Sequence, residues 1–125
     1  MTGLLIRKEW LDLILSGHKT WEIRGNATKT RGRIALIESG SGTVIGTCEL
    51  ADVVGPLGEK ELKSNASKLG VRPDVIRGTP YRTTYAWVLR SVHRLPRPVP
   101  YTHPAGAVIW VKLSPDVSGQ LGAVG

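Results

Sequence analysis

The amino-acid sequence predicts an α+β fold, a mostly antiparallel β-barrel with two or three short helices. The first reason is that apolar, β-branched runs of strand length outnumber the stretches with helical spacing. The second reason is that the helical stretches are inserted at only two places, early in the chain and near its middle. A closed or nearly closed barrel with helices at its ends fits this order. A chain of 125 residues is long enough for one hydrophobic core.

The first predicted elements are a strand, a helix and a second strand. Residues 4–6 form a short apolar run. Residues 7–16 place Trp10 and three aliphatic side chains at helical spacing, so Trp10 is expected in the core. Gly17 is expected to end this helix in a left-handed turn. The residues that follow, 19–24, are predicted to form a strand.

A hairpin is predicted next. Residues 34–37 form a continuous apolar run, and residues 43–54 form a β-branched strand, with Ser-Gly-Ser-Gly between them. A phosphate-binding loop is the alternative interpretation of this Gly/Ser segment. It joins two strands, however, and lacks the Gly-x-x-x-x-Gly-Lys-Ser/Thr pattern. We therefore interpret it as a turn, although Ser39 or Ser41 could still lie near a ligand.

The second half of the chain is predicted to contain the other helices and the last strands. A helix is expected over residues 59–69, ended by Gly70, and a short helical turn over residues 72–77. Residues 85–95 predict a strand. The remaining predictions are an extended, proline-rich segment near a sheet edge over 94–100, a final strand over 107–113, one domain over residues 1–113 and a flexible C-terminal tail over 114–125.

Charge and hydropathy narrow the class of partner. The formal net charge is +7, which favours an anionic partner such as RNA. The alternative is that the surplus cations only keep the protein soluble. Basic residues gather in two stretches, 19–33 and 90–97. No apolar run approaches the ~20 residues that cross a bilayer, and the first predicted helix carries acidic residues on its polar face, so no membrane partner is expected.

Cysteine and histidine usage argues against metal and disulfide chemistry. A single cysteine, Cys48, cannot form an internal disulfide or a zinc cluster with other cysteines, and it lies in a predicted strand as an apolar filler. The three histidines lack metal-ligand spacing, so neither a metal nor another cofactor is expected. The N-terminus has no secretory pattern, and a cytoplasmic location is therefore predicted.

The stretch that follows the first predicted helix is the main candidate for a functional site. It places Lys19, Glu22 and Arg24 within six residues. Three charged side chains so close together are not expected in a strand that is buried in the core. Strand alternation predicts that Thr20, Glu22 and Arg24 point to one side and Lys19 to the other. Lys19 and Arg24 could hold a phosphate, and Glu22 could accept from an amine or imino proton of a base. A structural ion pair between Glu22 and Arg24 is the alternative.

The pattern Gly-x-Lys-Thr-x-Glu-x-Arg over residues 17–24, placed after a helix, resembles the signature of the ASCH domain in the PUA-like superfamily. The resemblance extends to four further stretches and covers roughly residues 4–113; these stretches are 31–36, 44–47, 85–87 and 101–110. The chain is most similar to the small, single-domain bacterial type. This resemblance implies a small β-barrel similar to the PUA domain, and a nucleic-acid ligand.

The resemblance also raises the question of catalysis. ASCH-like proteins include nucleic-acid-binding modules, an amidohydrolase acting on N4-acetylcytidine and proteins with ribonuclease activity. The amidohydrolase uses a lysine, a threonine three residues later and a distant glutamate. Lys19 matches the lysine, but Glu22 takes the place of the threonine, and only Glu59 or Glu61 has the rough position of the glutamate. Enzymatic activity is left open, with Lys19 and Glu22 as the candidate catalytic residues.

The main prediction is an RNA- or nucleotide-binding module with a basic cleft, and the alternative is a small hydrolase acting on RNA or a modified nucleoside. The candidate ligand-binding residues are Lys19, Thr20, Trp21, Glu22, Arg24, Arg33, Tyr85 and His103. Trp21 could stack on a base or pack in the core. His103 could instead hold its own turn by hydrogen bonds, and a hydroxyl of Tyr81 or Tyr85 could reach the cleft. Lys19 is expected to be charged, because Glu22 offsets its desolvation.

Overall fold

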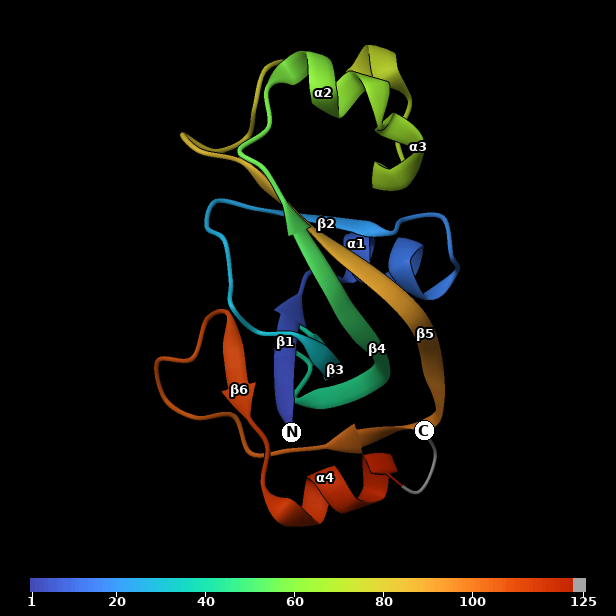
Figure 1. The fold of residues 1–125 in the computed structure, drawn as a ribbon. Helices are drawn as coiled ribbons and strands as arrows, with labels where there is room; N and C mark the ends of the chain where they lie inside the picture. Colours follow the sequence, from blue (N-terminus) through green and yellow to red (C-terminus); the bar gives the residue numbers. More distant parts are fainter. Residues whose placement is uncertain (123–125) are drawn as a thin grey trace.

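The computed structural model describes residues 1–122, and over these residues the α+β fold is confirmed. One six-stranded sheet curls into a half-barrel with the strand order β2-β5-β4-β3-β1-β6 (Figure 1). Neighbouring strands are antiparallel except β1 and β3, which are parallel. The sheet keeps β2 and β6 as its two edges instead of closing completely. The strands are β1 Thr2–Ile6, β2 Trp21–Arg24, β3 Gly32–Glu38, β4 Thr43–Val54, β5 Tyr85–Pro100 and β6 Trp110–Lys112.

The helices of the described chain are short. They are α1 Lys8–Leu15, α2 Glu59–Ser64, α3 Ala66–Leu69 and α4 Pro115–Gly122, with a 3₁₀ turn at Pro73–Val75. The helix predicted over residues 59–69 is broken at Asn65. The Asn65 side-chain amide donates to the Glu61 carbonyl at 2.8 Å, and its backbone has left helical geometry. Asparagine commonly interrupts a helix in this way, because its side chain competes for backbone partners.

The central hairpin has the predicted form. β3 and β4 pair antiparallel around the Gly/Ser loop, with Gly40 and Gly42 at positive φ. β5 is longer than the predicted strand and includes the proline-rich segment. β2 pairs only with Tyr85–Val88 of β5. The prolines come later in β5, beyond the part of the strand that β2 covers, which is where proline is tolerated in a sheet. β6 is shorter than the predicted strand over 107–113.

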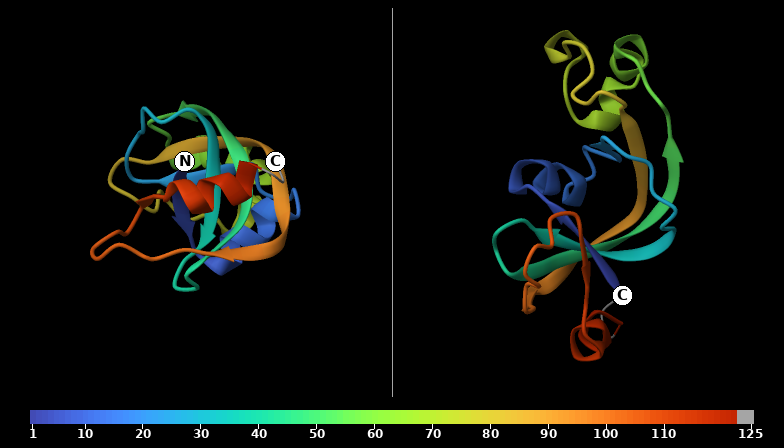
Figure 2. Two further views of the ribbon diagram at one scale, coloured as in Figure 1. Left: turned by 90° about the horizontal axis from the view of Figure 1, so that it is seen from below. Right: turned by 90° about the vertical axis from the view of Figure 1, so that its left-hand side faces the viewer.

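Within residues 1–122, three groups of buried apolar side chains hold the elements together. The first fills the half-barrel beneath α1 and includes Leu11 and Ile14 of that helix. The second lies at the end covered by α4, and the third joins α2 and α3 to β2. The two views in Figure 2 show α4 across one end of the sheet and α2 and α3 beyond the other.

Residues 115–122 form helix α4, where the sequence predicted a flexible tail. That prediction is wrong over these residues because α4 packs on the second core group: Leu121 is fully buried and Val117 half-buried. The Val117 N–H donates to the Ser114 hydroxyl, and the N-terminal ammonium donates to Ser118 at 3.0 Å. The rest of the predicted tail, residues 123–125, lies outside the described residues.

Candidate functional site

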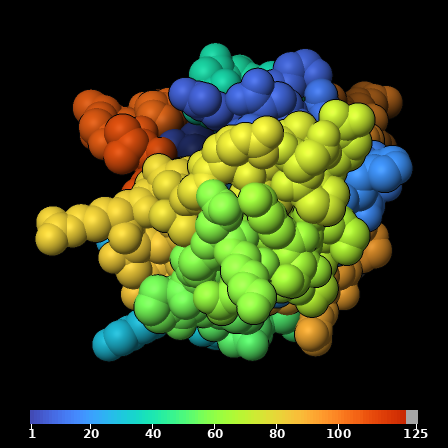
Figure 3. All heavy atoms as spheres, turned by 90° about the horizontal axis from the view of Figure 1, so that it is seen from above, coloured from blue at the N-terminus to red at the C-terminus, as the bar shows by residue number. Residues whose placement is uncertain are grey.

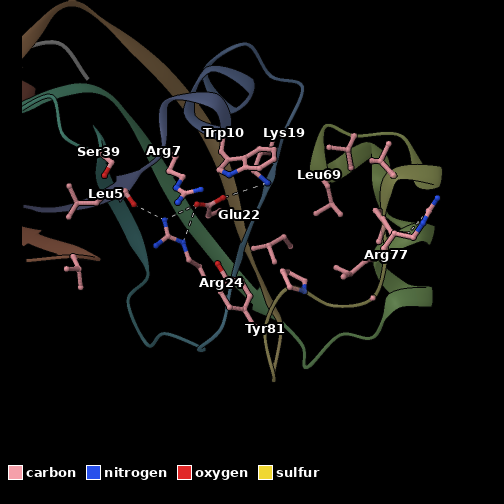
Figure 4. Close-up of a pocket in the computed structure, with 18 residues that line it drawn as sticks. Leu5, Arg7, Trp10, Lys19, Glu22, Arg24, Ser39, Leu69, Arg77 and Tyr81 are labelled. Carbon is pink, nitrogen blue, oxygen red and sulfur yellow. Dashed lines mark hydrogen bonds and ion pairs between the residues drawn. The ribbon is translucent and has the colours of Figure 1, made fainter.

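A cleft of about 700 Å³ lies beside β2, and segments far apart in the chain line it. β1, α1 and β2 contribute one side, and α2, α3 and residues 75–81 contribute the other. Seen from above, α2, α3 and the following segment, in green to yellow, cover this end of the molecule next to the blue N-terminal elements (Figure 3). The side chains that line the cleft are drawn in Figure 4.

The turn after α1 positions Lys19. Gly17 has a φ of 85°, the left-handed conformation that glycine adopts without strain. The His18 N–H donates to the Leu13 carbonyl at 2.9 Å and the Gly17 N–H to the Ile14 carbonyl at 3.1 Å, which together form a Schellman motif. The Lys19 N–H also donates to Leu13. The predicted helix end at Gly17 is confirmed, and the local sequence therefore sets the direction in which the chain leaves α1.

Lys19, Glu22 and Arg24 meet on one wall of the cleft (Figure 4). The Arg24 guanidinium donates to Glu22 Oε2 from Nη2 at 2.8 Å and from Nε at 3.2 Å. Its Nη2 also donates to the Leu5 carbonyl at 2.8 Å. Lys19 Nζ lies 3.7 Å from Glu22 Oε1, beyond hydrogen-bond range. Glu22 therefore bridges two cations, one through each carboxylate oxygen.

These charges are buried. Lys19 is 4% exposed and Glu22 5%, so the Glu22–Arg24 pair is not a solvated surface pair. The prediction that Lys19 and Glu22 point to opposite sides is wrong: Lys19 precedes β2, which begins at Trp21, so strand alternation does not apply to it. Taking charges out of water is costly unless they are paired, and the Lys19–Glu22–Arg24 network supplies that pairing.

Burial also affects the protonation of Lys19. Desolvation lowers the pKa of Lys19 below its ordinary value of 10.5, and the nearby Glu22 carboxylate opposes that shift. The net direction is downward. The ammonium of Lys19 is therefore easier to deprotonate than that of a lysine in water.

Two aromatic side chains stand at the cleft. Trp10 is 38% exposed, so the prediction that it is a core residue is wrong; the core side of α1 is made by its aliphatic residues. Lys19 Nζ lies 5.4 Å from the centroid of the Trp10 ring, within cation–π range. Tyr81 is 43% exposed and lies on the other side of Glu22 from Trp10 in Figure 4.

The remaining predicted ligand residues do not line this cleft. Trp21 is buried in the third core group, with Lys68 Nζ 4.8 Å from the centroid of its ring. Thr20 is exposed, and Tyr85 packs against the first core group. Arg33 donates to the Leu121 carbonyl of α4 at 3.2 Å. His103 bonds with the Tyr101 hydroxyl and the Ala107 carbonyl, each at 2.9 Å, as expected for a residue that holds its own turn.

Several lining residues were not identified from the sequence. Arg7 and Arg77 lie outside the two basic stretches, yet both line the cleft. Of the first basic stretch, 19–33, only Lys19 and Arg24 do so. Besides Lys19, Glu22 and Arg24, two lining residues had been considered from the sequence, Tyr81 and Ser39, each as a residue that could reach a ligand. Segment 75–81 has no periodic pattern, and no local signal showed that it would fold toward β2.

The two glutamates considered for a distant catalytic position have structural roles instead. Glu59 accepts from the Gly78 N–H and pairs with Lys63 Nζ at 3.2 Å. Glu61 Oε1 accepts from the Gly58 N–H at 2.9 Å as part of the N-terminal cap of α2. Neither glutamate lines the cleft, so Glu22 is the carboxylate that it presents among the described residues.

Residues 1–122 contain no group of three or more His, Cys, Asp or Glu side chains placed to hold a metal ion. Over the same part of the chain, no helix combines the length and apolar character that crossing a membrane requires.

Comparison with known proteins gives the family. A model of the ASCH domain matches residues 4–96, which is most of the chain. The chain belongs to the ASCH domain family. The structure of ASCH from Zymomonas mobilis is similar, with a TM-score of 0.71 and 20% identity; the match covers 98% of this chain and 94% of that chain. Two point mutants of the Zymomonas mobilis protein also match.

The mutants have TM-scores of 0.68 and 0.70 at 18% and 19% identity; both cover 98% of this chain, and 96% and 94% of their own chains. Identities this low show a shared fold alone. No curated protein matches the chain. The family match confirms the resemblance to the ASCH domain, while the ligand has to be inferred from the cleft itself.

Proposed function

We propose that this ASCH domain binds RNA or a nucleotide-like ligand in the cleft beside β2. The observation that supports this most directly is the buried network of Lys19, Glu22 and Arg24 on the wall of a concave site. Buried charges are expensive to maintain, and they gather at functional sites more often than elsewhere. A cleft of about 700 Å³ also falls within the usual range for small-ligand sites.

The charge of the lining favours an anionic ligand. Among the described lining residues, four are lysine or arginine and Glu22 is the single carboxylate, so the site carries a net positive charge. Arg7 and Arg77 are exposed and can meet phosphates without rearranging the core. The net charge of +7 adds long-range attraction for a polyanion.

Binding to a labelled single-stranded oligoribonucleotide at several salt concentrations tests the proposal. We expect affinity to fall with salt, since each neutralised phosphate contributes a slope of about −0.7 in log–log terms for single strands. The variant Arg7→Ala/Arg77→Ala should weaken binding and reduce the slope by about 1.4 if each arginine contacts one phosphate. Both side chains are exposed, so the fold should survive.

The matched control is Arg90→Ala/Arg97→Ala, which removes the same charge from β5. These arginines belong to the second basic stretch and do not line the cleft. If the control weakens RNA binding while Arg7→Ala/Arg77→Ala leaves it unchanged, RNA binds along β5 and the proposal is wrong. Affinity that is indifferent to Lys19→Ala/Arg24→Ala in a folded protein would also reject it.

One observation favours a second candidate function, hydrolysis of RNA or of a modified nucleoside. Because the pKa of Lys19 is lowered, a larger fraction of it than of an ordinary lysine is the neutral amine that can accept a proton, and it lines the cleft. Incubation with N4-acetylcytidine and with labelled RNA tests this, using Lys19→Ala as the comparison. Turnover that Lys19→Ala abolishes supports hydrolysis. No turnover, or turnover unchanged in Lys19→Ala, rejects it.

A further inference from the structure

The wall of the cleft presents one acceptor and one group of donors side by side. Lys19 Nζ and Glu22 Oε1 are 3.7 Å apart, too far for a hydrogen bond to each other. Arg24, by contrast, is already engaged, because its Nη2 and Nε donate to Glu22 Oε2 and its Nη2 also donates to the Leu5 carbonyl. A ligand at this wall therefore meets Lys19 and Glu22 first, and Arg24 acts mainly by holding Glu22 in place.

A phosphate fits this wall poorly. A phosphate oxygen within hydrogen-bond distance of Lys19 Nζ would also lie close to the Glu22 carboxylate, and like charges repel strongly where water is largely excluded. A neutral edge with an acceptor beside an N–H fits better. Its acceptor can receive a hydrogen bond from Lys19, and its N–H can donate to Glu22 Oε1. The Watson–Crick edges of nucleobases have this arrangement, and a carboxylate reads such donors well.

The rest of the cleft is arranged to match a flat ring with a charged tail. Trp10 and Tyr81 are exposed aromatic side chains that line the cleft on two sides of Glu22 (Figure 4). Bases stack readily on such rings. Arg7 has a side chain 79% exposed and Arg77 is also exposed, so both cations lie where solvent reaches them. Aromatic rings thus flank the buried acceptor, and solvent-exposed cations lie farther out.

We infer that the cleft takes its ligand base first: the edge of an unpaired nucleobase contacts Lys19 and Glu22, and the phosphate remains outside near Arg7 and Arg77. This inference rests on the proposed function and specifies the chemistry that the site recognises. The cleft selects its ligand by a ring that has an acceptor beside an N–H, and the phosphate adds affinity but does not determine specificity.

Ligand analogues test the orientation on the unaltered protein. The four ribonucleosides, ribose 5-phosphate and inorganic phosphate compete with the labelled oligoribonucleotide for the cleft. We expect at least one nucleoside to compete, and ribose 5-phosphate to compete at least tenfold more weakly than that nucleoside. Blocking the N–H of the preferred base by methylation, as in 3-methyluridine or 1-methylguanosine, should weaken competition roughly tenfold or more, because a buried charged acceptor then lacks its donor.

A variant with opposite effects on the two ligand types sharpens the test. Glu22→Gln removes the negative charge from the wall and leaves Lys19 and Arg24 in place. Nucleoside competition should weaken, while competition by ribose 5-phosphate or inorganic phosphate should strengthen. An unfolded variant would bind neither nucleosides nor phosphate compounds, so opposite changes in the two kinds of competition cannot come from misfolding. Glu49→Gln is the matched control, because Glu49 is an exposed carboxylate of β4 that does not line the cleft.

The outcomes separate the inference from the proposed function. If RNA binds and depends on Lys19, but ribose 5-phosphate competes as well as any nucleoside, the inference is overturned and the proposed function stands. The same holds if N–H methylation of the preferred base has no effect. If neither RNA nor any nucleotide binds the folded protein, the proposed function fails and the inference fails with it.

Discussion

Replacing Glu22 with glutamine should destabilise the protein more than any exposed carboxylate replacement. The change keeps the length and nearly the volume of the side chain but removes its charge. Lys19 and Arg24 then lose their shared counter-ion, while the side chains of Lys19 and Arg24 are only 5% and 17% exposed. Two like charges would remain near each other in a site that excludes most water.

The magnitude follows from the burial of the pair. Removing one partner of a buried ion pair costs about 3–5 kcal/mol. We expect the lower end, about 3 kcal/mol, because the glutamine oxygen still accepts from Arg24 and that guanidinium is partly solvated. An unfolding entropy of about 2.1 cal/mol/K per residue then converts 3 kcal/mol into a fall in Tm of roughly 10 °C for a domain of this size.

Thermal unfolding followed by circular dichroism at pH 7 and at pH 9.5 measures the effect. Burial lowers the pKa of Lys19, so between the folded pKa and 10.5 the unfolded chain binds more protons and stability rises with pH. Without Glu22 to oppose the desolvation, the pKa of Lys19 should fall further. The loss of stability caused by Glu22→Gln, measured as the fall in Tm, should therefore be smaller at pH 9.5 than at pH 7.

The control for this prediction is again Glu49→Gln, which should change the free energy of unfolding by no more than about 0.5 kcal/mol. A fall in Tm below about 3 °C for Glu22→Gln, or a deficit that does not shrink with pH, would refute the reasoning. Either result would mean that Lys19 and Arg24 are well solvated without their partner.

Three further predictions concern regions away from the charged wall. Burial raises the pKa of the Cys48 thiol to about 12, so an aromatic disulfide reagent at pH 8 should label the denatured chain and leave the folded protein unlabelled; rapid native labelling would contradict this. Glu59→Ala should speed hydrogen exchange of the Gly78 amide, which donates to that carboxylate. This hydrogen bond and Lys63 lower the pKa of Glu59 from 4.5, so the contact should hold above pH 4.5 and weaken only as the pH falls through the lower pKa that Glu59 has in the folded protein. Protection of the Gly78 amide that does not change in Glu59→Ala would show that the bond is unimportant. Leu121→Ala should cost about 2–5 kcal/mol, since Leu121 is fully buried, and urea unfolding would measure it; a cost below about 1 kcal/mol would mean that α4 contributes little to the core.

Much of the first half of the chain could be predicted from local signals. Gly17 ends α1 because its backbone readily adopts a positive φ, and the hairpin forms because two β-branched runs flank a glycine turn. The prediction of helix 59–69 was only partly right, since Asn65 interrupts it through its own side chain. Such interruptions depend on which hydrogen bond prevails, and a pattern of apolar residues contains no information on that competition.

The site was predicted in part. Lys19, Glu22 and Arg24 were identified from their density of charge, and the structure brings them together. Trp21 was also a candidate, yet it packs beneath α2 and α3, whereas Trp10, expected in the core, is partly exposed at the cleft. Both tryptophans lie in amphipathic stretches. Which face of a stretch becomes covered is decided by the elements that later fold onto it.

By itself, the sequence determined the family, the order of the elements before α4 and the charged stretch after α1, because these depend on neighbouring residues and their backbone preferences. The tertiary structure alone decided that Arg77 and Tyr81 face Lys19 and Glu22 across one cleft, since more than fifty residues separate them. It also decided that α4 is a packed helix, because Leu121 gains its stability from the second core group. Side chains buried between elements that are distant in the sequence come into contact only when the chain has folded, so local sequence patterns do not reveal these contacts.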